Sequence, residues 1–385
     1  KFTNVLSFQY NCIVDFFHFI LFRLLLNSSF YSIYRSFSII LHENDKFISN
    51  ITIYGYMIEK LDLKDRKILY QLDIDARQTD SQIAKKVGLS RDSVRYRINK
   101  LVDEGYINYF MTILNSMKLG YDWYRTFFKF QNLTLEKEKE IINWIKKRAS
   151  WITKIEGKWD INTGIFCKDI YEFRDLINEL LIKYNKYIED YETSVVTRMW
   201  HYHRDYLLEK GHKILDPEIM GFNTKEKRVL EKIDKTDYKI LEILLKNARM
   251  KTIDIARNVG TTEIVVRYRI KKLIDKGIIL GFRSFLNIKK LGYNYFKLHI
   301  NLKNYSREDK EKIFEYLMEN PNTAYTTELV GGSDIETEFQ VKDNEAFYEE
   351  IKKIREIFGS IIKDYEFMQY TEEYKFTYLP EIKFS

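Results

Sequence analysis

The chain has 385 residues, a net charge of +7, 45% hydrophobic and 31% charged side chains, which is the balance of a soluble globular protein. The length predicts two to three domains with sizeable cores. Its two cysteines, Cys12 and Cys167, form no CxxC pair, which argues against a disulfide framework and a structural zinc site and predicts a reducing, cytosolic setting.

Residues 1–56 form a doubtful leader, in which the first glycine is Gly55 and after which comes the first methionine, Met57. Our preferred hypothesis is that translation begins at Met57 and that the leader is not part of the folded protein. A membrane anchor is the alternative. The apolar segment 12–26 contains Asp15 and Arg23, and its longest uncharged run is shorter than the roughly 18 residues that a span needs, so we expect no membrane association.

The rest of the chain is a tandem repeat. Residues 62–121 align without a gap to 234–293, at an offset of 172 (237 − 65), with 29 identities in 60 positions. A repeat of this length is a duplicated domain, because solenoid units have only about 20–50 residues. The most uniform stretch is Val94–Ile98 against Val266–Ile270, a basic helix in both copies.

The front half of each copy, over 57–121 and 232–293, predicts three helices. Glycines at 88 and 260 end the second helix, and Ser90 and Thr262 are N-cap types that open the third. The apolar run 106–114 that follows predicts a β-hairpin. Three helices and a hairpin, with a glycine turn before the third helix, are typical of a winged helix-turn-helix.

The back half of each copy, over 122–206 and 294–385, predicts a different domain. In the first copy we expect strands at 122–131, 151–156, up to Cys167, and 190–203, with helices at 134–148 and 170–184. This order is βαββαβ, a ferredoxin-like sandwich, so the predicted fold class is α+β with two copies of each domain. Residues 207–231 are the predicted linker between copies.

The basic charge is concentrated in the front halves. Residues 60–110 hold 11 Lys/Arg and 8 Asp/Glu, and residues 232–282 hold 12 and 6, which gives +3 and +6. The remainder of the chain therefore sums to −2 (7 − 9). A basic surface on the winged-helix domains is expected of a protein that binds double-stranded DNA.

The third helix of each copy carries the expected DNA contacts. With Val94 at the centre of the buried face and 100° per residue, a polar and basic face points outward. The second copy has Glu263 and Val265 in place of Arg91 and Ser93, so the two helices should prefer different half-sites. Glu263 would either accept a hydrogen bond from a cytosine amine or repel phosphate. The alternative is a solvated helix face without DNA contacts. The predicted DNA-binding residues are Ser90, Arg91, Ser93, Arg95, Tyr96, Asn99, Lys100, Thr262, Glu263, Arg267, Tyr268, Lys271 and Lys272.

Arg97 and Arg269 differ from these residues because they lie about 60° from the buried centre. We predict that each is structural and pairs with an acid of the first helix, Asp65 or Asp237.

Three motifs stand out in the front half of the first copy: Leu61-Asp62-x-x-Asp65-x-x-Ile68-Leu69, then Ile83-Ala84-x-x-Val87-Gly88-Leu89-Ser90, then Val94-x-x-Arg97-Ile98-x-x-Leu101-x-x-x-Gly105-x-Ile107. Through these motifs the sequence resembles the Lrp/AsnC family of bacterial and archaeal transcriptional regulators. It implies that the back half senses an effector and dimerises. Tandem fusion departs from the family, whose members usually carry one copy per chain, and Thr261-Thr262 replaces Leu-Ser in the second copy.

The resemblance also implies an effector region in the Gly-x-x-Asp loops, with a small molecule such as an amino acid as ligand. Gly and Asp equally build a tight turn between two strands, so both interpretations stand. Trp159 against Ser333 implies that two such pockets would differ. The candidate effector residues are Gly157, Trp159, Asp160, Gly331, Ser333 and Asp334.

The sequence therefore predicts a DNA-binding transcriptional regulator, with no catalytic residues, metal or cofactor, whose two back halves pair within the chain. Pairing into a true homodimer stays open. One alternative is an enzyme of the siroheme decarboxylase type, since some of these share the double architecture. His201 and His203 alternate on a strand, but we favour chance surface histidines. Another alternative is a ligand sensor without specific DNA binding.

Overall fold

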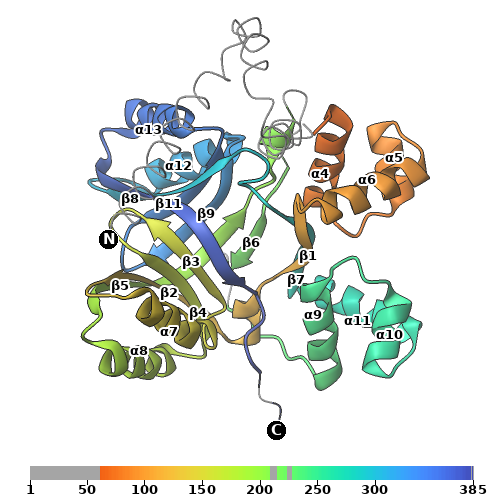
Figure 1. Cartoon of the computed structure of the whole chain (residues 1–385), viewed down its shortest axis with the longest axis horizontal. Helices are drawn as coiled ribbons and strands as arrows, with labels where there is room; N and C mark the ends of the chain where they lie inside the picture. Colours follow the sequence, from red (N-terminus) through yellow and green to blue (C-terminus); the bar gives the residue numbers. More distant parts are fainter. Residues whose placement is uncertain (1–60, 209–214, 223–227, 383, 385) are drawn as a thin grey trace, which may run out of the picture. The chain divides into compact units, whose positions relative to one another are not determined.

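The computed structural model describes residues 61–208, 215–222, 228–382 and 384, so the predicted leader over 1–56 lies outside the described residues. Apart from the hairpin expected over 106–114, both copies have the predicted order of elements (Figure 1). The first copy contains α4 (Leu63–Ile74), α5 (Asp80–Val87), α6 (Arg91–Asp103), β1 (Ile107–Leu114), β2 (Asp122–Phe130), α7 (Leu135–Lys146), β3 (Trp151–Glu156), β4 (Ile161–Cys167), α8 (Ile170–Tyr184) and β5 (Ile188–His201). The second contains α9 (Lys235–Lys246), α10 (Thr252–Val259), α11 (Glu263–Asp275), β7 (Ile279–Leu286), β8 (Asn294–Leu302), α12 (Arg307–Glu319), β9 (Thr323–Val330), β10 (Ile335–Val341), α13 (Asn344–Phe358) and β11 (Ile362–Phe376).

The first helix of each winged-helix unit begins at a capping box. Asp62 accepts a hydrogen bond from the Asp65 backbone, and the Asp65 side chain accepts one from the Asp62 backbone. Asp234 and Asp237 repeat the arrangement at the start of α9. Two amide groups that the helix itself leaves without partners are satisfied in this way, which fixes where each first helix begins.

The predicted hairpin over 106–114 is wrong. The segment is the single strand β1, and it pairs antiparallel with β7 of the other copy, with Phe110 opposite Ser284 and Thr112 opposite Phe282. An apolar run predicts a strand but not its partner, and here the partner lies in the second copy. The two winged-helix units are consequently joined by a two-stranded ribbon, to which each copy contributes one strand.

The two ferredoxin-like halves pair along both of their edges. β5 pairs with β9 and β11 pairs with β3, and all four strands run antiparallel to their partners. Together with the pairings inside each copy, the order β2-β4-β3-β11-β8-β10-β9-β5 closes on itself, because β5 also pairs with β2. We call these eight strands the closed sheet. The expected pairing of the two back halves within one chain is thus observed.

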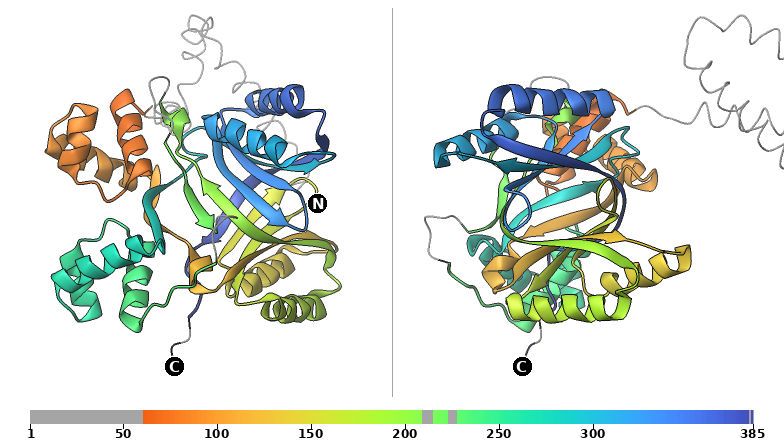
Figure 2. Two further views of the ribbon diagram at one scale, coloured as in Figure 1. Left: turned by 180° about the vertical axis from the view of Figure 1, so that it is seen from behind. Right: turned by 90° about the vertical axis from the view of Figure 1, so that its left-hand side faces the viewer.

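Helices cover the outside of the closed sheet. α7 and α8 lie on the strands of the first copy, and α12 and α13 on those of the second (Figures 1 and 2). Alternate residues of each strand pack beneath these helices, such as Tyr124 and Phe128 in β2 and Phe296 and Leu298 in β8. The intervening residues therefore face the inside of the closed sheet.

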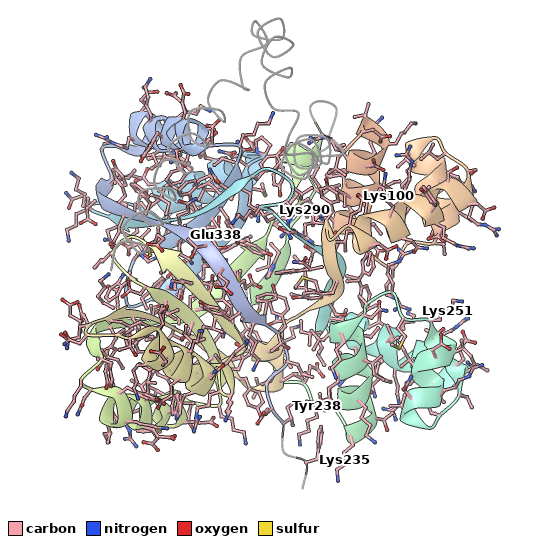
Figure 3. All side chains as sticks on the ribbon, viewed as in Figure 1. Lys100, Lys235, Tyr238, Lys251, Lys290 and Glu338 are labelled. Carbon is pink, nitrogen blue, oxygen red and sulfur yellow. The ribbon has the colours of Figure 1, made fainter. Side chains whose placement is uncertain are left out.

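The inside of the closed sheet contains buried charges. Lys297 Nζ lies 3.0 Å from Glu338 and also contacts Glu336, which pairs with Arg125. All four side chains are at most 4% exposed, and Figure 3 labels Glu338 among the strands. Burial opposes ionisation of Glu336, but Lys297 and Arg125 outweigh it and lower its pKa to about 2. The strand 334–341 thus has the predicted polar face, and this face is buried as well.

The predicted linker over 207–231 contains a ninth strand, β6 (Glu218–Gly221), which pairs with β5. Just before this linker, a buried ion pair docks the first winged-helix unit onto the segment that follows β5. Arg204 Nη1 lies 2.6 Å from Asp73 of α4, and Asp73 also accepts a hydrogen bond from the Arg204 amide at 2.8 Å. The equivalent of Asp73 in the second copy is Leu245 (73 + 172), so the two units are docked differently. Across the described ranges, no helix is long and apolar enough to cross a membrane.

The Asp73–Arg204 pair gives a stability prediction. Asp73→Ala should lower the free energy of unfolding by about 3–5 kcal/mol, because it leaves a buried guanidinium without its acid. Chemical denaturation, monitored by circular dichroism, measures this loss of unfolding free energy. Asp92→Ala is the control, because Asp92 is 75% exposed and should change stability by less than about 0.5 kcal/mol. Similar losses in both variants would contradict the docking role.

Candidate nucleic-acid interface

The predicted DNA-binding side chains lie on the outward faces of α6 and α11. Tyr96 is 69% exposed and Tyr268 64%, while Val94 and Val266 are fully buried on the opposite faces. Ser90 and Thr262 are the N-caps of the two helices and accept the amides of Ser93 and Val265. The other predicted residues are exposed or half-buried: Arg91, Ser93, Arg95, Asn99 and Lys100 in the first copy and Glu263, Arg267, Lys271 and Lys272 in the second. Lys100 and Lys251 mark the two units in Figure 3.

In each unit the arginine at the centre of the outward face, Arg95 or Arg267, pairs with an acidic side chain, but the two acids lie on different helices of their units. Arg95 Nε lies 3.1 Å from Asp80 at the start of α5. In the second copy Thr252 replaces Asp80 (80 + 172), and Arg267 instead pairs at 2.5 Å with Glu263 of its own helix. Hydrogen bonds from Thr252 and Arg267 lower the pKa of Glu263. Glu263 therefore links Thr252 of α10 with Arg267 and orients the guanidinium.

Arg97 and Arg269 pair with the first helix of their unit, as predicted. Arg97 Nη1 lies 2.7 Å from both Asp65 and Asp62. Arg269 makes the same two contacts with Asp237 and Asp234, at 2.7 Å each. The acids are those of the capping box, so each arginine ties the recognition helix to the start of the first helix.

A reciprocal arginine contact joins the two winged-helix units. Arg249 Nη1 donates to the carbonyls of Ala76 and Gln78 at 2.7 and 3.0 Å. Its counterpart Arg77 (249 − 172) donates to the carbonyls of Ala248 and Met250, the equivalent positions. The contact is therefore isologous, as in a two-fold dimer. We call this pair the arginine clamp. Neither arginine is among the predicted site residues, although the two are identical at equivalent positions of the repeat.

Comparison with known proteins places the chain among transcriptional regulators. A winged helix-turn-helix DNA-binding family matches residues 61–108 and 233–279. An HTH-type transcriptional regulator of Pyrococcus horikoshii is 31% identical over 149 residues, which is 92% of that protein and 38% of this chain. The proline dehydrogenase transcriptional activator of Rhizobium radiobacter is 34% identical over 128 residues, 82% of that protein and 32% of this chain. The regulator LrpA of Pyrococcus horikoshii is 50% identical over 62 residues, 44% of its length and 16% of this chain.

The chain belongs to the Lrp/AsnC family of transcriptional regulators. Relatives that match over about 150 residues correspond in length to one copy of this tandem Lrp/AsnC chain. Among solved structures, the siroheme decarboxylase NirDL matches with a TM-score of 0.53 and 15% identity, over 83% of this chain and 94% of that one. At this identity the likeness shows a shared two-copy fold alone.

The candidate effector loops of the Lrp/AsnC chain pack against the opposite copy. A side chain at Gly157 would come within 3.1 Å of the Phe367 carbonyl in β11, and one at Gly331 within 3.1 Å of the Thr193 carbonyl in β5. Both backbones have positive φ, which favours glycine.

The aspartates of these loops bond to neighbouring strands. Asp160 accepts the Phe130 amide at 2.7 Å and Asp334 accepts the Leu302 amide at 2.8 Å, so both build the turn. Within the described residues, the buried Trp159 Nε1 and Ser333 Oγ have no hydrogen-bond partner. A role for the six loop residues in effector binding stays a prediction.

His201 and His203 are not the surface histidines that we favoured, because both are buried. His201 Nδ1 lies 3.1 Å from the Tyr378 hydroxyl, and burial lowers the pKa of both imidazoles, that of His203 to about 4. Alternation on a strand does not distinguish a solvent face from one that a second element covers. Among the residues that the structure describes, no group of three or more His, Cys, Asp or Glu side chains is arranged to hold a metal ion.

The arginines at 97 and 95 provide a matched test of structural and DNA-contacting roles. Arg97→Ala should lower the free energy of unfolding by about 1 kcal/mol, since its ion pairs are partly exposed. Its effect on DNA affinity should be below twofold, whereas Arg95→Ala should weaken DNA binding with little loss of stability. Denaturation and mobility-shift titrations measure the two quantities. Weaker DNA binding by Arg97→Ala at unchanged stability would contradict the structural role.

Proposed function

We propose that this regulator binds one asymmetric operator with α6 and α11 together. The arginine clamp and the β1–β7 ribbon carry this proposal, because they join the two recognition helices with two-fold symmetry inside a single chain. Two-fold helix-turn-helix pairs contact half-sites one DNA turn apart, about 34 Å. The chain therefore needs no second copy to present two recognition helices, and its unequal helices match an operator with unequal halves.

The electrostatic part of the proposal predicts strong salt dependence. Lys and Arg contacts with phosphate release counterions, so the logarithm of affinity should fall linearly with the logarithm of salt concentration. A mobility-shift series on the chain's own upstream DNA, with unrelated DNA as competitor, measures this slope. Arg95→Ala and Arg267→Ala should each weaken specific binding by about tenfold, at different half-sites, if each removes about 1–3 kcal/mol. Binding that salt does not weaken, or that competitor removes fully, would overturn the proposal.

The second half-site should contain thymine opposite the start of α11. Ile264 is 80% exposed and Val265 36%, at the helix end whose residues usually reach base edges. Their counterparts in α6 are Asp92 and Ser93 (264 − 172, 265 − 172). Two exposed β-branched side chains there suit the 5-methyl group of thymine, which is the apolar feature of the major groove.

Uracil substitution tests this directly, because it removes the methyl group and keeps the hydrogen-bonding pattern. In the tightest duplex selected from a random pool, uracil in the second half-site should weaken binding by about fourfold, as expected for about 0.8 kcal/mol. Ile264→Ala should abolish this sensitivity. Asp92→Ala, at the equivalent position of α6, should leave it intact. Equal sensitivity of the wild type and Ile264→Ala would contradict the contact, even if both bind DNA.

We further propose that a small effector acts where the two back halves pair, and that the protein is not an enzyme. The alternative, a tetrapyrrole enzyme of the siroheme decarboxylase type, is favoured by the likeness of both copies to NirDL. Against it, Tyr378 engages His201, and at the positions equivalent to the two histidines the second copy has Lys375 and Thr377 (201 + 174, 203 + 174). A preparation that binds a tetrapyrrole and becomes coloured would support the enzyme hypothesis, because the regulator hypothesis predicts no tetrapyrrole binding.

A further inference from the structure

Several polar groups inside the closed sheet have no hydrogen-bond partner. Asn162 is fully buried, and neither its amide nitrogen nor its amide oxygen is bonded within the described part of the chain. The same holds there for Ser194 Oγ, His299 Nε2 and Arg125 Nε. A buried polar group without a partner costs about 1–3 kcal/mol, so such a set is expected only where something else completes the hydrogen bonds.

The register of the strands brings these groups together. Asn162 lies opposite Phe127, and Ser194 lies opposite Arg125, so all four face the inside of the closed sheet. The ring of Phe127 lies 5.0 Å from that of His299, and His299 Nε2 is 3.8 Å from Glu336, the partner of Arg125. The set is therefore one site, built from β2, β4 and β5 of the first copy and from β8 of the second.

Arg125 is the group that defines the chemistry of the site. Its Nη1 contacts Glu336, whereas its Nε has no partner in the described ranges and the nearest acceptor of Nη2 is Met199 Sδ at 4.0 Å. The guanidinium lies 4.9 Å from the ring of Trp123 and 5.2 Å from that of Trp151, which fix its plane. We call the Nε–Nη2 side of Arg125 its free edge, because its one contact among the described residues is the weak thioether acceptor of Met199, and a planar guanidinium edge of this kind is suited to a bidentate carboxylate.

Comparison of the two copies shows which group the first copy lacks. Arg125 is equivalent to Lys297 (125 + 172), and Lys297 has two acids of its own copy, Glu336 and Glu338. At the positions equivalent to these acids the first copy has Asn162 and Gly164 (336 − 174, 338 − 174). Arg125 thus shares Glu336 with Lys297 and has no acid of its own copy at these two positions.

The space beside Gly164 is already filled, because a side chain there would come within 2.4 Å of the Trp123 ring. The place of the missing acid is therefore on the Asn162 side of Arg125. The inward row of β5 continues from buried Ser194 to half-buried Glu192, near which Lys158 and Glu366 form a partly exposed ion pair at 3.3 Å. The least buried side chains of this row therefore lie at this end of the closed sheet.

We propose that the inside of the closed sheet binds a small carboxylate, which lies on the free edge of Arg125 with Asn162 and Ser194 beside it. The ligand supplies the acid that the first copy lacks. His299 is neutral there, since burial lowers its pKa to about 4, so it contributes a hydrogen bond and no charge. The proposal deepens the effector hypothesis by naming a site and a ligand class, and it does not depend on DNA binding.

The test uses the full chain without DNA and three probes: acetate, propionate and glycine, each titrated against chloride at constant ionic strength. Tryptophan fluorescence and the thermal midpoint should both change saturably with at least one probe, at one equivalent per chain, because Trp123 and Trp151 flank Arg125. Asn162→Leu, which keeps the branching at Cγ but removes both polar atoms of the amide, should weaken binding of that probe at least tenfold. Thr163→Val is the control: it changes a neighbouring buried polar residue of β4 that faces the helices, and should leave affinity unchanged.

A chain that responds to none of the three probes would overturn the proposal, and the unpartnered groups would then be held by ordered water only. Unchanged affinity in Asn162→Leu would also overturn it, because binding would then be elsewhere. Acetate and propionate binding without glycine would show that the ligand carries no ammonium group, and would still support the carboxylate site. DNA affinity is measured separately in carboxylate-free buffer, so failure here is distinguishable from failure of the operator proposal.

Discussion

The structure depends on one constraint: the two edge strands of each four-stranded half pair antiparallel with the two edge strands of the other half. A four-stranded sheet alone would expose two rows of unpaired amides and carbonyls, which promotes association with other chains. Here β5 with β9 and β11 with β3 remove both rows by pairing the copies with each other. The same two-fold relation is repeated by the ribbon and the arginine clamp, so one symmetry positions both the closed sheet and the recognition helices.

Covalent fusion permits the two halves to differ in ways that a symmetric dimer cannot. In a homodimer every residue at a two-fold interface is present twice, so a glutamate beside one cation implies a glutamate beside the other. This chain instead places Glu336 in one copy and Asn162 at the same position of the other. The acid that holds the recognition arginine likewise moves from Asp80 to Glu263. Each difference occurs where a ligand or DNA would contact the chain, and the shared framework remains intact.

Local sequence predicted those features that depend on local physics. The helix at 170–184 was predicted with the bounds that α8 has, because its cap and its apolar spacing are encoded within the segment. The Arg97 pair with Asp65 followed from an angle on a helix. The hairpin failed because nothing within 106–114 specifies a partner in the other copy. For the same reason, the alternation in 334–341 revealed a polar face but not that this face lies inside a sheet closed by the strands of the other copy.

The connection between the closed sheet and the winged-helix units determines how a ligand inside could influence DNA binding. Arg283 of β7 donates to the backbone carbonyls of His201 and Tyr202 at the end of β5, and Arg204 then pairs with Asp73 of α4. Both winged-helix units therefore contact the same short segment after the last inward residues of β5. Ser194 lies on that strand as well, so a ligand that moved β5 would act on both units through rigid, hydrogen-bonded elements. Because the Asp73–Arg204 ion pair belongs to the first unit and the second has Leu245 at the position of Asp73, such a movement would affect the two half-sites unequally.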